Sequence, residues 1–132
     1  MKKEVISDKE WKNKLTAEQY QILREKGTES PFTGKYVNFN EKGEYACTGC
    51  GNILFDSSKK FDSACGWPSF YDAKKDAVEL KEDNSLGMNR TEVICKRCGG
   101  HLGHIFKDAP DQPTGNRFCI NSAGLNFRGT KK

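Results

Sequence analysis

Apolar and polar residues alternate along this chain with two different periodicities. Near the N-terminus, Ser7-x-x-Glu10 and Thr16-x-x-Gln19 each match a capping box, the signature with which many helices begin. The apolar residues that follow the two boxes at helical spacing are Trp11, Leu15, Tyr20, Ile22 and Leu23. Gly27 suits the position after a helix end. The pattern therefore predicts two short helices that pack their apolar sides onto the rest of the domain.

The alternating pattern of β-strands follows, and it is clearest near the C-terminus. Phe118 is aromatic and Ile120 is β-branched, as is typical of strands, and they alternate with Arg117, Cys119 and Asn121. In a strand, Phe118 and Ile120 point into a core while Arg117, Cys119 and Asn121 share the opposite face. Positive charge near a thiol favours the thiolate, which is the reactive form. Cys119 is therefore a candidate nucleophile, although the same pattern also fits a small buried cysteine.

Length and composition are consistent with a mainly β chain of one domain. The chain has 132 residues, including 13 glycines that suit many turns and short strands. We expect a single domain over 1–132, with a helical segment at 1–30, a β core at 31–127 and a tail at 128–132. The net charge is +4, and the basic residues are dispersed among acidic ones, so we expect no nucleic-acid partner. No apolar run approaches the roughly 20 residues of a membrane span.

The beginning of the chain bears on the compartment. Residues 1–4 (Met-Lys-Lys-Glu) are followed by no apolar segment of the kind found in secretory signals. We therefore expect a cytoplasmic protein, in which structural disulfides are rare and cysteines more often bind metal or react.

Four of the six cysteines form two matching motifs, Cys47-x-x-Cys50-Gly51 and Cys95-x-x-Cys98-Gly99. Such a turn presents two thiolates to one tetrahedral metal while the glycine permits a tight backbone. Two of them predict one structural Zn²⁺ bound by four cysteines. Iron with the same ligands is chemically possible. A thioredoxin-like redox pair is a weaker interpretation, because no βαβ pattern surrounds either motif.

Cys65 and Cys119 remain once the metal ligands are set aside. Cys65 begins Cys-Gly-Trp-Pro-Ser-Phe (65–70), which is too rich in Gly and Pro for a regular element, so we expect a loop. A second thiol is what a sulfenic acid needs to condense into a disulfide. An unrelated surface thiol is the alternative for Cys65.

The only two histidines, His101 and His104, lie in a glycine-rich segment. In a straight strand they face opposite sides, but Gly103 could introduce a bend or bulge that brings both to one pocket. Either could then act as a general acid, because histidine titrates near neutral pH. A hydrogen-bonded structural role is the alternative for each.

Taken together, these motifs closely resemble the methionine-R-sulfoxide reductases of type B. The resemblance covers about residues 27–127 and rests on the two Cys-x-x-Cys pairs, 65–70, His-Leu-Gly-His (101–104) and Arg-Phe-Cys-Ile-Asn-Ser (117–122). It implies a mainly β fold with two antiparallel sheets, short N-terminal helices and a four-cysteine zinc site remote from the chemistry. Ala109 and Gly124 depart from the family pattern, which puts local loop geometry in question.

The resemblance also implies a reaction and assigns roles to residues. Cys119 attacks the sulfoxide sulfur, and His101 or His104 protonates the oxygen while Asn121 orients groups beside it. Arg117 belongs to the same catalytic set. Cys65 then forms a disulfide with Cys119, which thioredoxin reduces. Trp67 contacts the ε-methyl group, and Phe106 is assigned with Trp67 to substrate binding.

Two other classes of function stay open on sequence alone. A zinc-ribbon binding module would need a concentrated basic face and would give Cys65, Cys119 and the histidines no role. A zinc-linked redox sensor would oxidise its metal thiolates. The sequence leaves open whether free or protein-bound methionine sulfoxide is preferred, and we expect a monomer.

Overall fold

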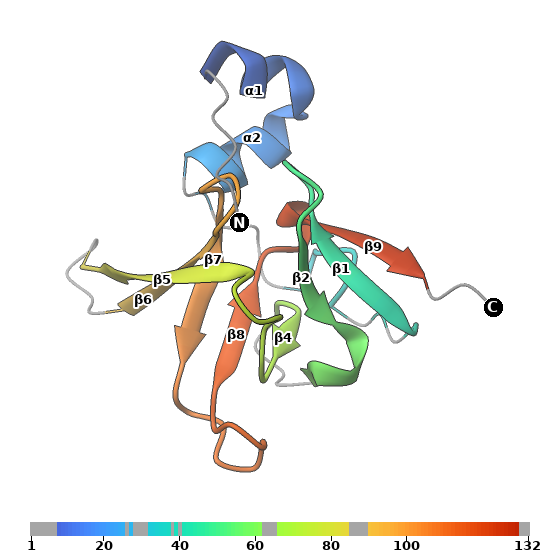
Figure 1. Cartoon of the computed structure of the whole chain (residues 1–132), viewed down its shortest axis with the longest axis vertical. Helices are drawn as coiled ribbons and strands as arrows, with labels where there is room; N and C mark the ends of the chain where they lie inside the picture. Colours follow the sequence, from blue (N-terminus) through green and yellow to red (C-terminus); the bar gives the residue numbers. More distant parts are fainter. Residues whose placement is uncertain are drawn as a thin grey trace.

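The computed structural model describes residues 8–25, 27, 32–37, 39, 41–61, 66–84 and 90–129. Two helices lie at one end of the molecule, and two β-sheets extend from beneath them (Figure 1). Ser7 of the first capping box and Cys65 fall outside the described residues.

The two helices form where the capping pattern predicted them. α1 covers Asp8–Lys14 and α2 covers Ala17–Arg24. The Thr16 hydroxyl accepts from the Gln19 N–H at 3.2 Å, and the Gln19 side chain accepts from the Thr16 N–H at 3.0 Å. The helix ends at Arg24, and the Gly27 N–H donates to the Gln21 carbonyl at 2.8 Å. Neither described helix is long and apolar enough to cross a membrane.

All strand pairings among the described residues are antiparallel, and they form two sheets. The smaller sheet has the order β2 (Ile53–Asp56), β1 (Gly43–Cys47), β9 (Leu125–Gly129). The larger sheet has the order β3 (Lys60–Phe61), β4 (Ser69–Phe70), β8 (Arg117–Ile120), β7 (His101–Phe106), β6 (Arg90–Cys95), β5 (Val78–Asp83). Two 3₁₀ turns are η1 (Ser57–Lys59) and η3 (Ser122–Gly124). The predicted mainly β fold with two antiparallel sheets is confirmed.

Aromatic side chains from both sheets meet in a shared core. Phe55 of β2 stacks on Phe70 of β4 with ring centroids 4.3 Å apart, and it meets Phe118 of β8 edge-on at 5.7 Å. Tyr45 of β1 is fully buried and packs against Phe70 at 5.2 Å. Such ring pairs contribute about 0.5–1.5 kcal/mol each beyond the area they bury. The core thus fixes the position of β8, the strand that carries Cys119.

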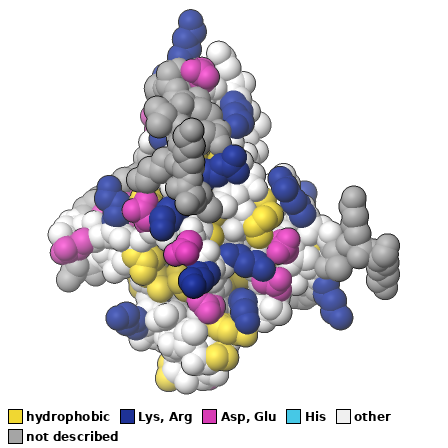
Figure 2. All heavy atoms as spheres, viewed as in Figure 1, with side chains coloured by type: hydrophobic (Ala, Val, Ile, Leu, Met, Phe, Trp, Pro, Cys, Tyr) yellow, Lys and Arg dark blue, Asp and Glu magenta, His cyan; other side chains and the backbone are white. Residues whose placement is uncertain are grey.

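Charged side chains of both signs cover the visible face of the molecule. Lys and Arg side chains lie next to Asp and Glu side chains over the middle of this face (Figure 2). Among the described residues, Lys74 Nζ lies 3.2 Å from a Glu44 oxygen and 3.7 Å from an Asp56 oxygen. The described part of this face therefore presents charges of both signs (Figure 2).

Candidate active site and metal centre

The two Cys-x-x-Cys motifs form two turns with the same geometry. In each turn the glycine N–H donates to the first cysteine's carbonyl at 2.8 Å, from Gly51 to Cys47 and from Gly99 to Cys95. Gly51 and Gly99 have φ angles of 80° and 75°, which residues with a Cβ rarely adopt. Cys47 is the last residue of β1 and Cys95 the last of β6. The glycine that follows each motif is thus required by the turn.

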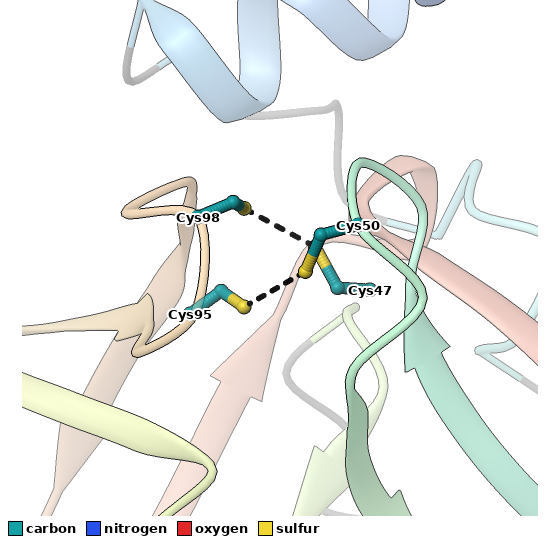
Figure 3. A group of neighbouring side chains, drawn as sticks. All are labelled: Cys47, Cys50, Cys95 and Cys98. Atoms are coloured by element: carbon teal, nitrogen blue, oxygen red, sulfur yellow. Dashed lines mark hydrogen bonds between the residues drawn. The ribbon is translucent and has the colours of Figure 1, made fainter. Parts of the chain in front are cut away.

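The two turns bring four sulfur atoms together between the sheets (Figure 3). The Sγ atoms of Cys47 and Cys98 are 3.7 Å apart and those of Cys50 and Cys95 are 3.5 Å apart. All four sulfurs lie within 4.8 Å of one another. A tetrahedral zinc with Zn–S bonds of about 2.3 Å spaces its sulfurs about 3.8 Å apart. The four cysteines are therefore positioned to hold one metal ion.

The electrostatics of this cluster favour a bound cation. Hydrogen bonds to Cys50, Cys95 and Cys98, together with burial, raise the pKa of the Cys47 thiol. Hydrogen bonds from Cys47, Cys50 and Cys98 lower the pKa of the Cys95 thiol. Four adjacent thiolates would repel one another. A divalent cation removes that repulsion and lets all four ionise.

The N-terminal helices pack on the four-cysteine cluster. The Arg24 guanidinium donates to the Cys98 carbonyl at 3.0 Å and lies 4.9 Å over the Trp11 ring. Trp11 is buried against Gly49 within the first turn, where a Cβ would come within 3.1 Å of the ring. The apolar residues predicted to face the domain therefore pack on the cysteine turns.

A small cavity of about 90 Å³ opens beside β7 and β8, away from the four cysteines. The residues that line it are Trp67, Arg90, Gly103, His104, Phe106, Cys119 and Asn121. Five of these were predicted as site residues, and Arg90 and Gly103 are additions. His101 and Arg117 are absent from the lining.

The alternation predicted for β8 is present. Phe118 and Ile120 are buried in the core, while Cys119 is half-buried and reaches the cavity. Cys119 is paired in register with His104 of β7. Asn121 follows the strand, and its backbone N–H and side-chain amide both donate to the Leu102 carbonyl, at 2.9 and 3.1 Å. These two hydrogen bonds connect the end of β8 to β7 next to the thiol.

An irregularity in the β6–β7 pairing brings the two histidines together. Val93 pairs with Gly103 and Ile94 pairs with His101, so β7 has one extra residue at Leu102. The His101 and His104 rings consequently lie 5.4 Å apart, centroid to centroid. The bulge expected near Gly103 is thus present. A Cβ on Gly103 would lie 2.0 Å from the Cys119 carbonyl oxygen, so the close approach of β7 to β8 requires glycine.

Each histidine is held by a carboxylate that sequence reasoning missed. His101 Nδ1 lies 2.7 Å from Glu92 Oε2, and both side chains are buried. His104 Nε2 lies 2.8 Å from Asp83 Oδ2, which is also 3.8 Å from Arg90 Nη2. A buried Glu in the otherwise apolar end of β6 was the available signal, because unpaired buried charges are rare.

The Arg117 guanidinium is paired with a carboxylate from the loop between β7 and β8. It forms two hydrogen bonds with the Asp108 carboxylate, at 3.0 and 2.9 Å, and lies 4.6 Å over the Phe106 ring. Hydrogen bonding to Arg117 lowers the pKa of Asp108. Arg117 therefore holds the Phe106 wall of the cavity, and its charge is compensated by Asp108.

The described neighbours of Cys65 are Gly66 and Trp67. Trp67 is half-buried and lines the cavity, and the Gly66 carbonyl accepts from the Phe32 N–H at 2.7 Å. Since Cys65 itself falls outside the described residues, its pairing with Cys119 stays a prediction.

These features define a β protein with a half-buried thiol beside two carboxylate-bound histidines and, separately, a four-cysteine cluster. Comparison with known families identifies the class to which it belongs. The chain belongs to the family of the SelR domain, whose model matches residues 15–129. Similar relatives bear the name peptide methionine sulfoxide reductase MsrB. The one from Methanosarcina barkeri is 58% identical over 92% of this chain and 86% of its own. Those from Leptospira interrogans and Cellvibrio japonicus are 55% and 57% identical over 92% of this chain, and over 93% and 87% of their own lengths. The resemblance to the type B reductases and the prediction of an oxidoreductase are confirmed.

Proposed function

We propose that this protein reduces the R epimer of methionine sulfoxide to methionine, with Cys119 as the nucleophile, and so repairs proteins under oxidative stress. The observation that carries the proposal is the shared cavity of Cys119, His104 and Asn121. The relatives' names specify peptide methionine sulfoxide as their substrate.

The first step transfers the sulfoxide oxygen to the enzyme. The Cys119 thiolate attacks the sulfoxide sulfur while a histidine protonates the oxygen, because a sulfoxide sulfur is a poor electrophile until its oxygen is protonated. The hydroxyl then moves from the substrate sulfur to Cys119 Sγ as the bond between the two sulfurs breaks. Methionine leaves as the thioether, and Cys119 is left as a sulfenic acid. Sulfur of the substrate is reduced by two electrons, and Cys119 is oxidised by two.

The second step restores the thiol. The Cys65 thiol condenses with the Cys119 sulfenic acid, forms a disulfide and releases water. An external dithiol then reduces that disulfide by exchange, and the family resemblance suggests thioredoxin for this role. This sequence gives both cysteines outside the metal centre a function.

The cavity dimensions suit the end of a methionine side chain. Trp67 and Phe106 provide apolar walls, and sulfur–aromatic contacts contribute about 0.3–1.5 kcal/mol each. About 90 Å³ is room for the methyl, sulfur and oxygen but not for the whole amino acid. The remainder of the substrate would stay outside, which supports action on both free and protein-bound sulfoxide.

One structural Zn²⁺ bound by Cys47, Cys50, Cys95 and Cys98 fits this donor set. Four thiolates are typical of zinc or iron. The ion would cross-link β1 to β6 and therefore one sheet to the other. None of its ligands lines the cavity, so we assign the metal to folding.

We further propose a single domain over 1–132 that acts as a cytoplasmic monomer. The reaction needs reduced thiols, and the cytoplasm keeps thiols reduced. The mixed charges in Figure 2 would give nucleic acid no continuous basic surface on that face.

The deciding experiment is turnover of the two separated sulfoxide epimers with dithiothreitol as reductant. We expect methionine from the R epimer only. Cys119→Ser should abolish it with any reductant, because a serine hydroxyl cannot form the sulfenic state. Reduction by that variant, or no reduction by the wild type, would contradict the proposal. Thiol counting separates the other classes: the enzyme has two reactive thiols, whereas a zinc-linked sensor loses four together with its metal.

A further inference from the structure

Two carboxylates contact the two histidines through different ring nitrogens. Glu92 lies 2.7 Å from Nδ1 of His101, and Asp83 lies 2.8 Å from Nε2 of His104. Glu92 is 2% exposed and Asp83 8% exposed, so water competes little for these bonds. The two histidines lie side by side, and each is hydrogen-bonded to a carboxylate through a different ring nitrogen.

An ionised carboxylate only accepts hydrogen bonds, so the ring nitrogen that faces it must carry a proton. Neutral His101 is therefore the Nδ1–H tautomer, and neutral His104 is the Nε2–H tautomer. The Arg90 guanidinium, 3.8 Å from the Asp83 oxygen that faces His104, favours the ionised form of Asp83.

We propose that Asp83 is a positioning residue that holds His104 in the Nε2–H tautomer and so directs its Nδ1 to the substrate. This inference rests on the proposed function and extends it to a carboxylate outside the cavity. His104 lines the cavity with Cys119 and is paired in register with it, whereas His101 is 3% exposed and outside the lining. With Nε2 bound to Asp83, Nδ1 is the nitrogen of His104 that remains for the substrate.

The proton transfer balances without rearrangement. The imidazolium of His104 gives its Nδ1 proton to the sulfoxide oxygen as Cys119 attacks the sulfur. The product is the neutral Nε2–H tautomer, which already donates to Asp83. The Asp83 charge then stays compensated by Arg90. His104 therefore loses its proton next to an ion pair that has no net charge.

The other charged or titratable groups that face His104 come from each adjacent strand. They are Asp83 of β5, Arg90 and Glu92 of β6, His101 of β7 and Cys119 of β8. Among these, Asp83 is the carboxylate in hydrogen-bond contact with the ring. It is therefore the group whose removal should change the His104 tautomer.

Nitrogen-15 NMR of the imidazole side chains tests this directly, because the chain has only two histidines. Above their titration range, we expect one ring protonated at Nδ1 and the other at Nε2. Asp83→Asn should abolish the fixed Nε2–H pattern of His104 and leave His101 unchanged, and Glu92→Gln should do the reverse. Two identical tautomers in the wild type would overturn the inference.

Kinetics separate positioning from a purely structural role. We expect Asp83→Asn to slow the first turnover with the R epimer by about tenfold or more, with KM changed less than about twofold. Asp83→Glu, which keeps the carboxylate, should recover part of the rate. Glu82→Gln removes the same charge from an exposed position of the same strand and should change neither spectrum nor rate.

Circular dichroism and metal content show whether each variant is folded. A folded Asp83→Asn protein with an unchanged His104 spectrum or an unchanged first turnover would overturn this inference alone. A wild type that reduces neither sulfoxide epimer would instead overturn the proposed function. The spectra of the wild type are informative in both cases, because they do not require substrate.

Discussion

Gly103→Ala should both destabilise the protein and displace its nucleophile. A Cβ at this position would lie 2.0 Å from the Cys119 carbonyl oxygen and 3.0 Å from the Ile120 Cα. Those atoms are backbone of a central strand, so they cannot swing aside as a side chain would. β7 and β8 must therefore separate by about 1 Å or more for ordinary contact distances to be restored.

The cost follows from what that separation breaks. Overpacking alone costs about 1–3 kcal/mol. Weakening two neighbouring strand bonds, such as the 2.9 Å bond from Asn121 N–H to the Leu102 carbonyl, adds about 1 kcal/mol each. The sum of about 3–5 kcal/mol is a large part of the stability of a typical domain. Cys119 moves with its carbonyl, so first-turnover rate should also fall.

Urea unfolding followed by circular dichroism measures the stability, and quenched-flow detection of methionine measures the first turnover. Gly124→Ala is the matched control, because its Cβ would lie 3.5 Å from the Leu23 and Leu102 side chains, in ordinary contact. We expect it to be neutral or to stabilise by about 0.4–1 kcal/mol. Equal midpoints and equal rates for Gly103→Ala and the wild type would refute the reasoning.

Three further predictions concern the four-cysteine cluster, the buried Tyr45 and Cys65. Cys98→Ser should release the metal and lower the midpoint of urea unfolding before it affects chemistry, because a structural ion contributes its binding energy to folding; metal analysis that finds neither zinc nor iron in fresh wild-type protein would contradict this. Burial, with Tyr36 and Glu41 nearby, raises the pKa of Tyr45 to about 12. The free energy of unfolding should therefore be unaffected below pH 10 and should fall by about 3 kcal/mol as the pH rises toward 12 and beyond, where Tyr45 ionises more readily in the unfolded chain. Tyr45→Phe should remove that alkaline loss in urea unfolding at pH 7 and 11.5, since its hydroxyl has no hydrogen-bond partner among the described residues, and an equal loss in both proteins would count against it. Cys65→Ser should release one methionine per enzyme and then stall with thioredoxin while dithiothreitol partly restores turnover; full thioredoxin-dependent turnover would show that Cys65 does not resolve the sulfenic acid.

Local sequence was sufficient wherever the cause of a structure is local. The Thr16–Gln19 capping box, the glycine after each Cys-x-x-Cys pair and the alternation of Phe118, Cys119 and Ile120 each depend on residues within one turn or strand. Their hydrogen bonds and φ angles are dictated by neighbours in the chain. These features were therefore predictable, as was the four-cysteine centre, since its two turns are each self-contained.

Pairings between distant segments were not predictable in this way. Which strand lies beside His101 and His104 depends on strand order and on the bulge in β7, so Glu92, Asp83 and Arg90 emerged only from the fold. Arg117 illustrates the same limit, because the strand pattern gave no sign of Asp108, on the loop that precedes β8, whose carboxylate accepts two hydrogen bonds from the guanidinium.

The sequence by itself thus determined the family, the elements, the four-cysteine cluster and the candidate nucleophile, because these reside in short motifs and in alternation along single strands. The tertiary structure alone decided which histidine reaches the cavity, which carboxylate holds each ring and why Gly103 must lack a side chain. The physical reason is that hydrogen bonds between strands depend on register, and a shift of one residue reverses the face on which a side chain lies.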